Sequence, residues 1–83
     1  MESKIGEVTH FYAKPSAAVL KLVGEIEVGD QIHVLGHTTD IRQEVASLQI
    51  DHQEVEGAKP GDDVALLVED TVRDGDEVFK VEG

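Results

Sequence analysis

Apolar and polar residues alternate in short runs along most of this chain, a pattern typical of half-buried β-strands. The clearest case is residues 17–23, where Ala18, Leu20 and Leu22 fall on one side of the expected strand and Lys21 on the other. The alternation predicts strands at residues 4–14, 17–23, 31–36, 41–52, 63–69 and 77–82. Strands at spacings of roughly ten residues are typical of an all-β barrel or sandwich.

The first expected strand, residues 4–14, carries apolar side chains on both faces. With regular pleating, Val8 and Tyr12 share one face, whereas Ile5 and Phe11 share the other. A β-bulge would change which face points inward, so this pattern leaves open which set lies in the core.

The expected strand at residues 41–52 breaks the two-residue period, because Val45 and Leu48 are three positions apart. A bulge near Ala46 would place Val45, Leu48 and Ile50 together on the core side. A short amphipathic helix is the alternative, since the same spacing fits helical periodicity. We favour the strand.

Residues 63–69 form the most continuously apolar stretch of the chain. A run without polar alternation is typical of a strand covered on both faces. We therefore expect this strand to be central in the sheet.

Three Gly-Asp pairs precede strand-like runs: Gly29-Asp30, Gly61-Asp62 and Gly75-Asp76. Glycine tolerates positive φ, and an aspartate carboxylate bonds to nearby backbone N–H groups. Each pair therefore predicts a turn that leads into a strand.

The length of 83 residues predicts a single domain spanning residues 1–83 with a thin core. The chain has no cysteine, so no disulfide can support that core. Closing a sheet on itself removes exposed strand edges, and we expect a small closed antiparallel β-barrel of six to seven strands.

The net charge of −11 is concentrated in the second part of the chain. Residues 51–83 carry eleven acidic and three basic side chains, against seven and four in residues 1–50. Lys/Arg clusters normally supply affinity for phosphates, and this chain has no basic run. We expect no DNA or membrane binding, and a cytoplasmic location because the start is polar and no long apolar segment is present.

The four histidines, His10, His33, His37 and His52, do not form an evident metal site. His33 and His37 share the spacing of some zinc-binding helices. On an extended strand, however, four residues span about 13 Å, which is too far for two ligands of one ion. We expect surface histidines or histidines with satisfied hydrogen bonds.

The acidic pairs are also poorly spaced for chemistry. Asp74, Asp76 and Glu77 lack the remaining positions of a calcium loop. Asp62-Asp63 and Glu69-Asp70 flank one strand, about 20 Å apart, too far for a catalytic carboxylate pair.

No nucleophile motif, phosphate-binding loop or dinucleotide fingerprint is present in the sequence. Ser3, Ser16 and Ser47 lie in no recognisable catalytic setting, and Thr38 and Thr39 are more typical of a turn. We therefore expect a protein that is not an enzyme and has no catalytic, cofactor or metal residues.

One local feature favours RNA. Phe11 and Tyr12 are adjacent, so one ring faces outward, and Lys14 and Lys21 lie near them. Exposed rings beside cations can stack bases, although the net charge of the chain opposes this function.

Three segments, in the same order along the chain, resemble the second domain of translational GTPases such as elongation factor Tu. The segment Gly24–Ile32 (GEIEVGDQI) is similar to its G-x-I-x-x-G-D-x-[IV] stretch. Val45–His52 (VASLQIDH) is similar to its V-x-S-I-x-M strand, and Glu54–Leu66 (EVEGAKPGDDVAL) to its A-x-P/A-G-[DE]-N-V-G-[LF] segment. Asp63 and Ala65 depart from the Asn and Gly common in that last motif.

This resemblance implies a closed antiparallel barrel that acts as a rigid adaptor. In translation factors the domain packs on the GTPase domain and contacts the ribosome and, in some members, the aminoacyl end of tRNA. The GTPase domain itself is missing here, so nucleotide hydrolysis is not implied. A similar small barrel occurs at the C-terminal end of some collagenase-like peptidases and related RNA-modification enzymes.

Three functions follow from these observations as hypotheses. The first is a non-catalytic adaptor barrel that binds a protein partner. The second is a translation-associated module that contacts the ribosome or tRNA, which the net charge disfavours. The third is a detached docking domain of a collagenase-like peptidase or RNA-modification enzyme.

Overall fold

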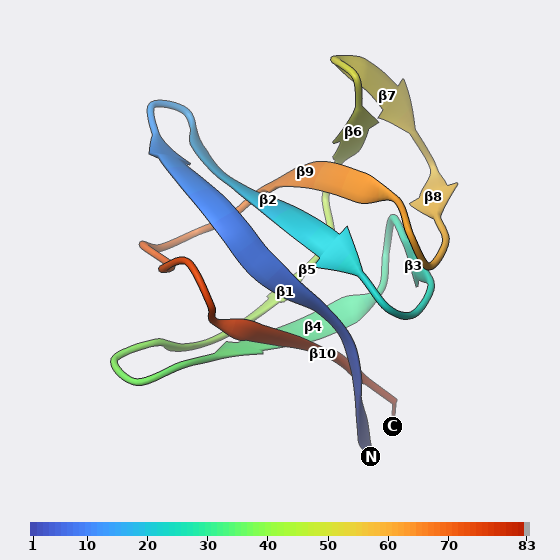
Figure 1. Ribbon diagram of the computed structural model, residues 1–83. Helices are drawn as coiled ribbons and strands as arrows, with labels where there is room; N and C mark the ends of the chain where they lie inside the picture. The colour runs from blue at the N-terminus through green and yellow to red at the C-terminus, as the bar shows by residue number, and fades with distance from the viewer. Residues whose placement is uncertain (83) are drawn as a thin grey trace.

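The computed structural model describes residues 1–82, and within them the chain forms strands and turns (Figure 1). The strands are β1 Glu2–Ala13, β2 Ser16–Leu22, β3 Ile26–Glu27, β4 Gln31–Leu35, β5 Asp40–Glu44, β6 Leu48–Ile50, β7 Gln53–Val55, β8 Gly57–Ala58, β9 Asp63–Leu67 and β10 Glu77–Val81. The large antiparallel sheet has the order β5-β4-β10-β1-β2-β9-β6-β7, and β3 pairs with β8 in a small second sheet. The predicted all-β class is therefore confirmed.

The expected closed barrel is not confirmed, because the hydrogen-bonded ladder of the described residues ends at β5 on one side and β7 on the other. The backbone groups of Val45, just after β5, bond to the turn at Gly29 and Asp30 instead, at 2.8 Å each. A side chain crosses the gap between β5 and the end of β9. The buried Gln43 amide donates to the Leu67 carbonyl and accepts from the Glu69 N–H, both at 2.9 Å.

The bulge expected in β1 is present. The register of β1 shifts between Lys4 and Gly6 against β10, and between Val8 and His10 against β2. These shifts allow Ile5 and Val8 to be buried together. They also change which alternate positions of β1 face the core, and simple alternation could not predict this change.

The expected strand at residues 41–52 is divided in the structure. Val45 and Leu48 are buried on either side of a break, so the strand interpretation is confirmed and the helical alternative is wrong. The segment also ends earlier than predicted, because Asp51 and His52 have positive φ (51° and 65°) and form a tight hairpin turn into β7. Two positive φ values match the twist of a two-residue hairpin, and Asp and His tolerate this region better than most residues.

The three Gly-Asp turns have the same construction. In each, the aspartate N–H donates to the carbonyl of the residue three positions earlier, and the aspartate carboxylate accepts from that residue's N–H. The intervening glycines have φ of 98°, 95° and 91°, as a type II turn requires. The pairs are Asp30 with Glu27 (3.1 and 2.9 Å), Asp62 with Lys59 (3.1 and 3.2 Å) and Asp76 with Arg73 (3.0 and 2.8 Å).

The core lies inside the curved sheet. As predicted, Ala18, Leu20 and Leu22 of β2 point into it. The expectation that residues 63–69 are covered on both faces is wrong for the described chain. Val64 and Leu66 are buried, but Leu67 is 46% exposed, because nothing within residues 1–82 packs over the outer face of β9.

The two ends of the described chain lie side by side (Figure 1). The amino group of Met1 donates to the carbonyl of Glu82 at 2.7 Å, and the N–H of Glu82 donates to the carbonyl of Met1 at 2.8 Å. The turn between β1 and β2 lies at the far end of the molecule from them. Over residues 1–82, no helix has the length and apolar character needed to cross a membrane.

Candidate functional site

A histidine with a carboxylate on each side is the densest group of ionisable residues in the fold. The His33 ring, buried on β4, bonds through Nδ1 to Glu2 at 2.9 Å and through Nε2 to Asp40. Arg42 lies 3.3 Å from the other oxygen of Glu2. We call this group the His33 clamp. It joins the start of β1 to the β4–β5 hairpin.

The His33 clamp engages both nitrogens of the ring and favours its charged form. Hydrogen bonds to Glu2 and then Asp40 raise the pKa of His33, and the bond to His33 lowers the pKa of Glu2. With both ring nitrogens engaged, neither remains to exchange a proton with a third molecule. The clamp matches the expectation of a histidine with satisfied hydrogen bonds.

The other residues considered from the sequence are not brought together in the described part of the chain. His10, His37 and His52 are exposed, and His52 lies in the β6–β7 turn. No group of three or more His, Asp or Glu in that part is arranged to hold a metal ion. Asp76, from the predicted acidic cluster, is buried and used in its turn.

The hydrogen bonds given by serine and threonine hydroxyls go to backbone carbonyls in the described part of the chain. Thr9 donates to the carbonyl of Val19 at 3.2 Å, and Ser16 donates to that of Ala13 at 3.4 Å. Within residues 1–82, no hydrogen bond joins a serine or threonine hydroxyl to a histidine or a carboxylate. A nucleophile needs such a base in reach.

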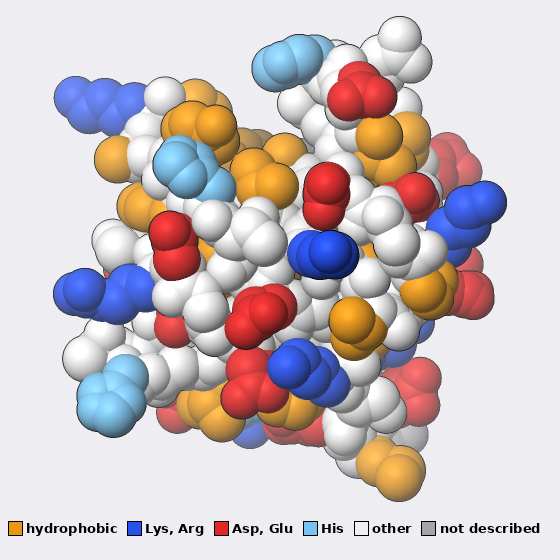
Figure 2. Space-filling view, in the orientation of Figure 1, with side chains coloured by type: hydrophobic (Ala, Val, Ile, Leu, Met, Phe, Trp, Pro, Cys, Tyr) orange, Lys and Arg blue, Asp and Glu red, His pale blue; other side chains and the backbone are white. Residues whose placement is uncertain are grey.

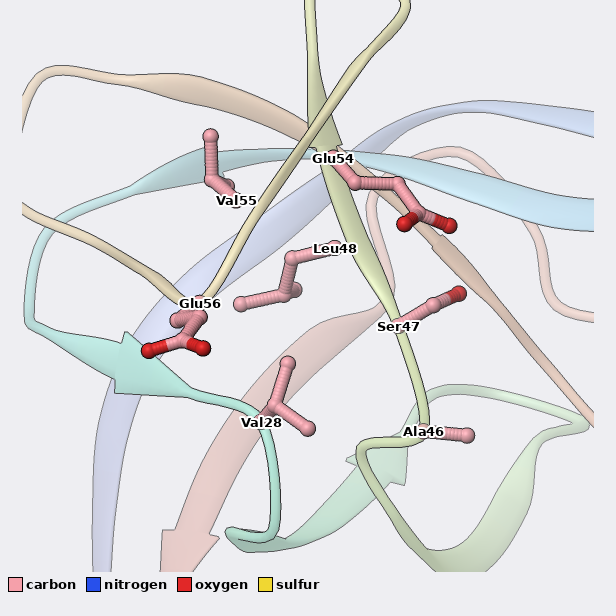
Figure 3. A pocket seen from close by; sticks show the side chains of 7 residues that line it. All are labelled: Val28, Ala46, Ser47, Leu48, Glu54, Val55 and Glu56. Atoms are coloured by element: carbon pink, nitrogen blue, oxygen red, sulfur yellow. The ribbon is translucent and has the colours of Figure 1, made fainter.

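The surface has two neighbouring grooves, and the first follows the junction of β3, β6 and β7 (Figure 3). We call it the acidic groove; its volume is about 320 Å³. In Figure 3, Leu48 lies between Val28 and Val55, while Glu54 and Ser47 extend to one side. It is lined by Val28, Ala46, Ser47, Leu48, Glu54, Val55 and Glu56.

The second groove crosses the outer face of β2, β9 and β6. We call it the alanine groove, and its volume is about 280 Å³. Its floor is low because Ala17 and Ala65 point outward from neighbouring strands, where Val19 pairs with Ala65 and Ala17 with Leu67. It is lined by Pro15, Ala17, Ser47, Gln49, Glu54, Ala65, Leu66 and Leu67.

Both grooves are small for sites that bind small molecules. Sites for small molecules usually have about 300–1,000 Å³ and enclose most of the ligand. These two grooves are at or below the lower end of that range and share Ser47 and Glu54 at their common border. Sequence reasoning missed them. The signal in the sequence was the alanines at outward positions of two apolar strands.

Comparison with known proteins finds a relative among curated proteins and similar folds among solved structures. No family model matches the chain. A protein named uncharacterized protease from Methanocaldococcus jannaschii is 42% identical over 77 residues, which cover 92% of this chain and 19% of that protein. The chain thus spans about one fifth of the length of the curated relative it matches.

The two structures are crystal structures of the C-terminal domain of a U32 peptidase from Geobacillus thermoleovorans. One has a TM-score of 0.88 at 16% identity, covering 94% of this chain and 91% of the other. The second, a selenomethionine variant, has a TM-score of 0.87 at 15% identity, covering 92% and 96%.

These matches revise the resemblance inferred from sequence. They do not support the likeness to the second domain of translational GTPases. Of the resemblances drawn from the sequence, they fit the small barrel at the C-terminal end of some collagenase-like peptidases. At 15–16% identity the two structures establish the fold alone: this chain is a small all-β domain with the fold of the C-terminal domain of a U32 peptidase.

Proposed function

We propose that this chain is a non-catalytic docking domain that works with a U32-type catalytic unit. The observation that carries the proposal is the difference between the two shares of sequence that align with the M. jannaschii protein. Nearly all of this chain aligns, but it accounts for only 19% of that protein. The similarity is therefore confined to one module of a much larger protein.

The chemistry of the described residues supports docking over catalysis. Two buried polar side chains, those of His33 and Gln43, use their hydrogen bonds to join strands. The open surface offers grooves of side-chain size. Such grooves are where a partner's side chains can anchor.

The test is capture of a defined enzyme. The chain, tagged at its N-terminus, is mixed with a purified U32-type enzyme, and complex formation is followed by size-exclusion chromatography. We expect a complex, and a change in the enzyme's turnover when the chain is added. A scrambled-sequence chain of equal charge is the control. Absence of both a complex and an effect on turnover would reject the proposal.

A translation-associated module is the second candidate, and one observation favours it. Tyr12 is 53% exposed and its ring centroid lies 4.4 Å from that of His10, near Lys14. Paired rings beside a cation can stack bases. Ribosome co-sedimentation at low salt tests this candidate, and absence from the ribosomal fractions removes it.

A further inference from the structure

The outer face of β1, β2 and β9 carries an exposed apolar row. Tyr12 pairs with Ala17 across β1 and β2, and Ala17 pairs with Leu67 across β2 and β9. Tyr12 and Leu67 are 53% and 46% exposed. Figure 2 shows hydrophobic side chains gathered at the upper left, over the end of the molecule where the β1–β2 turn lies.

A second row of outward-facing residues runs beside the first. His10 pairs with Val19, Val19 with Ala65, and Ala65 with Gln49. The rings of His10 and Tyr12 on β1 pack against each other, and Ala17 and Ala65 on β2 and β9 line the alanine groove. The face therefore combines a groove lined by small apolar side chains with two exposed rings on a neighbouring strand.

The sequence of β9 is that of a strand with both faces covered. Its apolar positions continue through Ala65 and Leu67, although only Val64 and Leu66 contact the core. Side chains that the core does not use have no folding reason to be apolar on a solvated face. A contiguous apolar face of this kind marks an interaction surface.

Charge limits what can cover this face. The charged side chain lining the alanine groove is Glu54, and Glu69 and Asp70 come two and three residues after the end of β9. The net charge of −11 disfavours a nucleic acid here, and it also disfavours a second copy of the chain, which carries the same charge. The complementary surface has apolar side chains at its centre and Lys or Arg around them.

From these observations we infer that the alanine groove is the docking site for a U32-type catalytic unit, which inserts apolar side chains flanked by Lys or Arg. The inference rests on the proposed function and adds the contact face. In the M. jannaschii relative about four fifths of the chain lies outside the matched segment, so a unit large enough to supply such a surface exists beside this module.

Two variants of the groove and one matched control test the assignment. Leu67→Arg places a charge in the apolar row, and Ala65→Gln fills the floor without changing the charge. Val28→Arg is the control, since Val28 is similarly exposed (44%) but lines the acidic groove. Affinity for the same purified U32-type enzyme is measured by calorimetry, after thermal melting shows that each variant is folded.

We expect both groove variants to weaken binding at least tenfold and Val28→Arg to change it less than twofold. Binding by both groove variants within twofold of the original chain would overturn the assignment while leaving the proposed function intact. Weakening by Leu67→Arg alone would show that the groove floor is not occupied, which also overturns it. No binding by the original chain would reject the proposed function and this inference together.

Sedimentation equilibrium of the chain alone tests the choice of occupant. We expect a monomer. A dimer that is lost in Leu67→Arg would show that a second copy occupies the face, and would overturn the inference.

Discussion

Strands β2 and β9 have two apolar faces that behave differently. On the inner face, Leu20 pairs with Val64 and Ala18 with Leu66, and all four are at most 2% exposed. One residue further along each strand, the outer face carries Ala17, Val19, Ala65 and Leu67, none of which is buried. The same two strands therefore serve the core on one side and present an uncovered apolar surface on the other.

The difference separates what folding requires from what it does not. The inner face belongs to the buried core, whose apolar contacts supply the hydrophobic free energy that a small domain depends on. The outer face adds little to that free energy in the isolated chain. Substitutions on the two faces should therefore differ in their effect on the free energy of unfolding.

The largest effect should come from the inner face. Leu20→Ala removes a fully buried side chain and leaves a cavity, at a cost of about 2–5 kcal/mol in the free energy of unfolding. A domain of this size has a total of only about 4–12 kcal/mol. Urea unfolding followed by circular dichroism measures the change. A loss below about 1 kcal/mol would contradict the packing described for β2.

The next effect should come from the amide that spans the gap beside β9. Gln43→Ala leaves the Leu67 carbonyl and the Glu69 N–H without their partner, and we expect a loss of about 1–3 kcal/mol. Gln49→Ala, an exposed amide on the outer face, is the matched control and should change stability by less than about 0.5 kcal/mol. Equal effects of the two variants would mean that Gln43 does not bridge the gap in solution.

The His33 clamp should make stability depend on pH, independently of both apolar faces. Because the folded pKa of His33 is raised, its contribution is complete below the ordinary value of 6.5 and is lost as pH rises through the folded pKa. Because the pKa of Glu2 is lowered, its contribution is present above the ordinary value of 4.5 and is lost as pH falls through the folded pKa. The clamp therefore stabilises the fold most between about pH 4.5 and 6.5.

His33→Gln keeps a hydrogen-bonding side chain but does not titrate. Comparison of the thermal unfolding of this variant and the original chain from pH 5 to 9 tests the clamp. The difference in melting temperature should shrink as pH rises. A difference that is constant over this range would show that the ring is not charged in the folded state.

The smallest effect on stability should come from the outer face. Leu67→Arg replaces a half-exposed side chain on the surface of β9, and we expect a change within about 0.5 kcal/mol. The same urea titration used for Leu20→Ala measures it. A loss as large as that of Leu20→Ala would mean that the outer face belongs to the core.

Much of the fold could be predicted from the sequence because its signals are local. Alternation located β2, and the Gly-Asp pairs located three turns that repeat one hydrogen-bonding pattern. The bridge made by Gln43 and the bond of His33 to Glu2 could not be assigned in this way, because these partners lie 24 to 31 positions away along the chain. The openness of the sheet was missed for the same reason, since it depends on how the residues around Val45 bond to a distant turn.

The candidate surface was only half visible in the sequence. The continuous apolar run of residues 63–69 was recognised, but its pattern cannot distinguish a face covered by the same chain from one covered by a partner. That distinction needs the register of Ala17 with Leu67, which brings residues 50 positions apart into one row. The sequence therefore indicated more apolar residues in this strand than one buried face needs, but it did not show which surface of the molecule they form.

The paired ends of the chain bear on how such a domain can be combined with others. Met1 and Glu82 hydrogen-bond to each other. If the domain were inserted into another protein, the two connecting segments could therefore lie side by side. A domain of that kind tolerates insertion into a surface loop of another protein, and its ends can be linked and reopened elsewhere as a circular permutant. The residues that line the alanine groove are not those that pair the two ends, so the groove would be present in each of these arrangements.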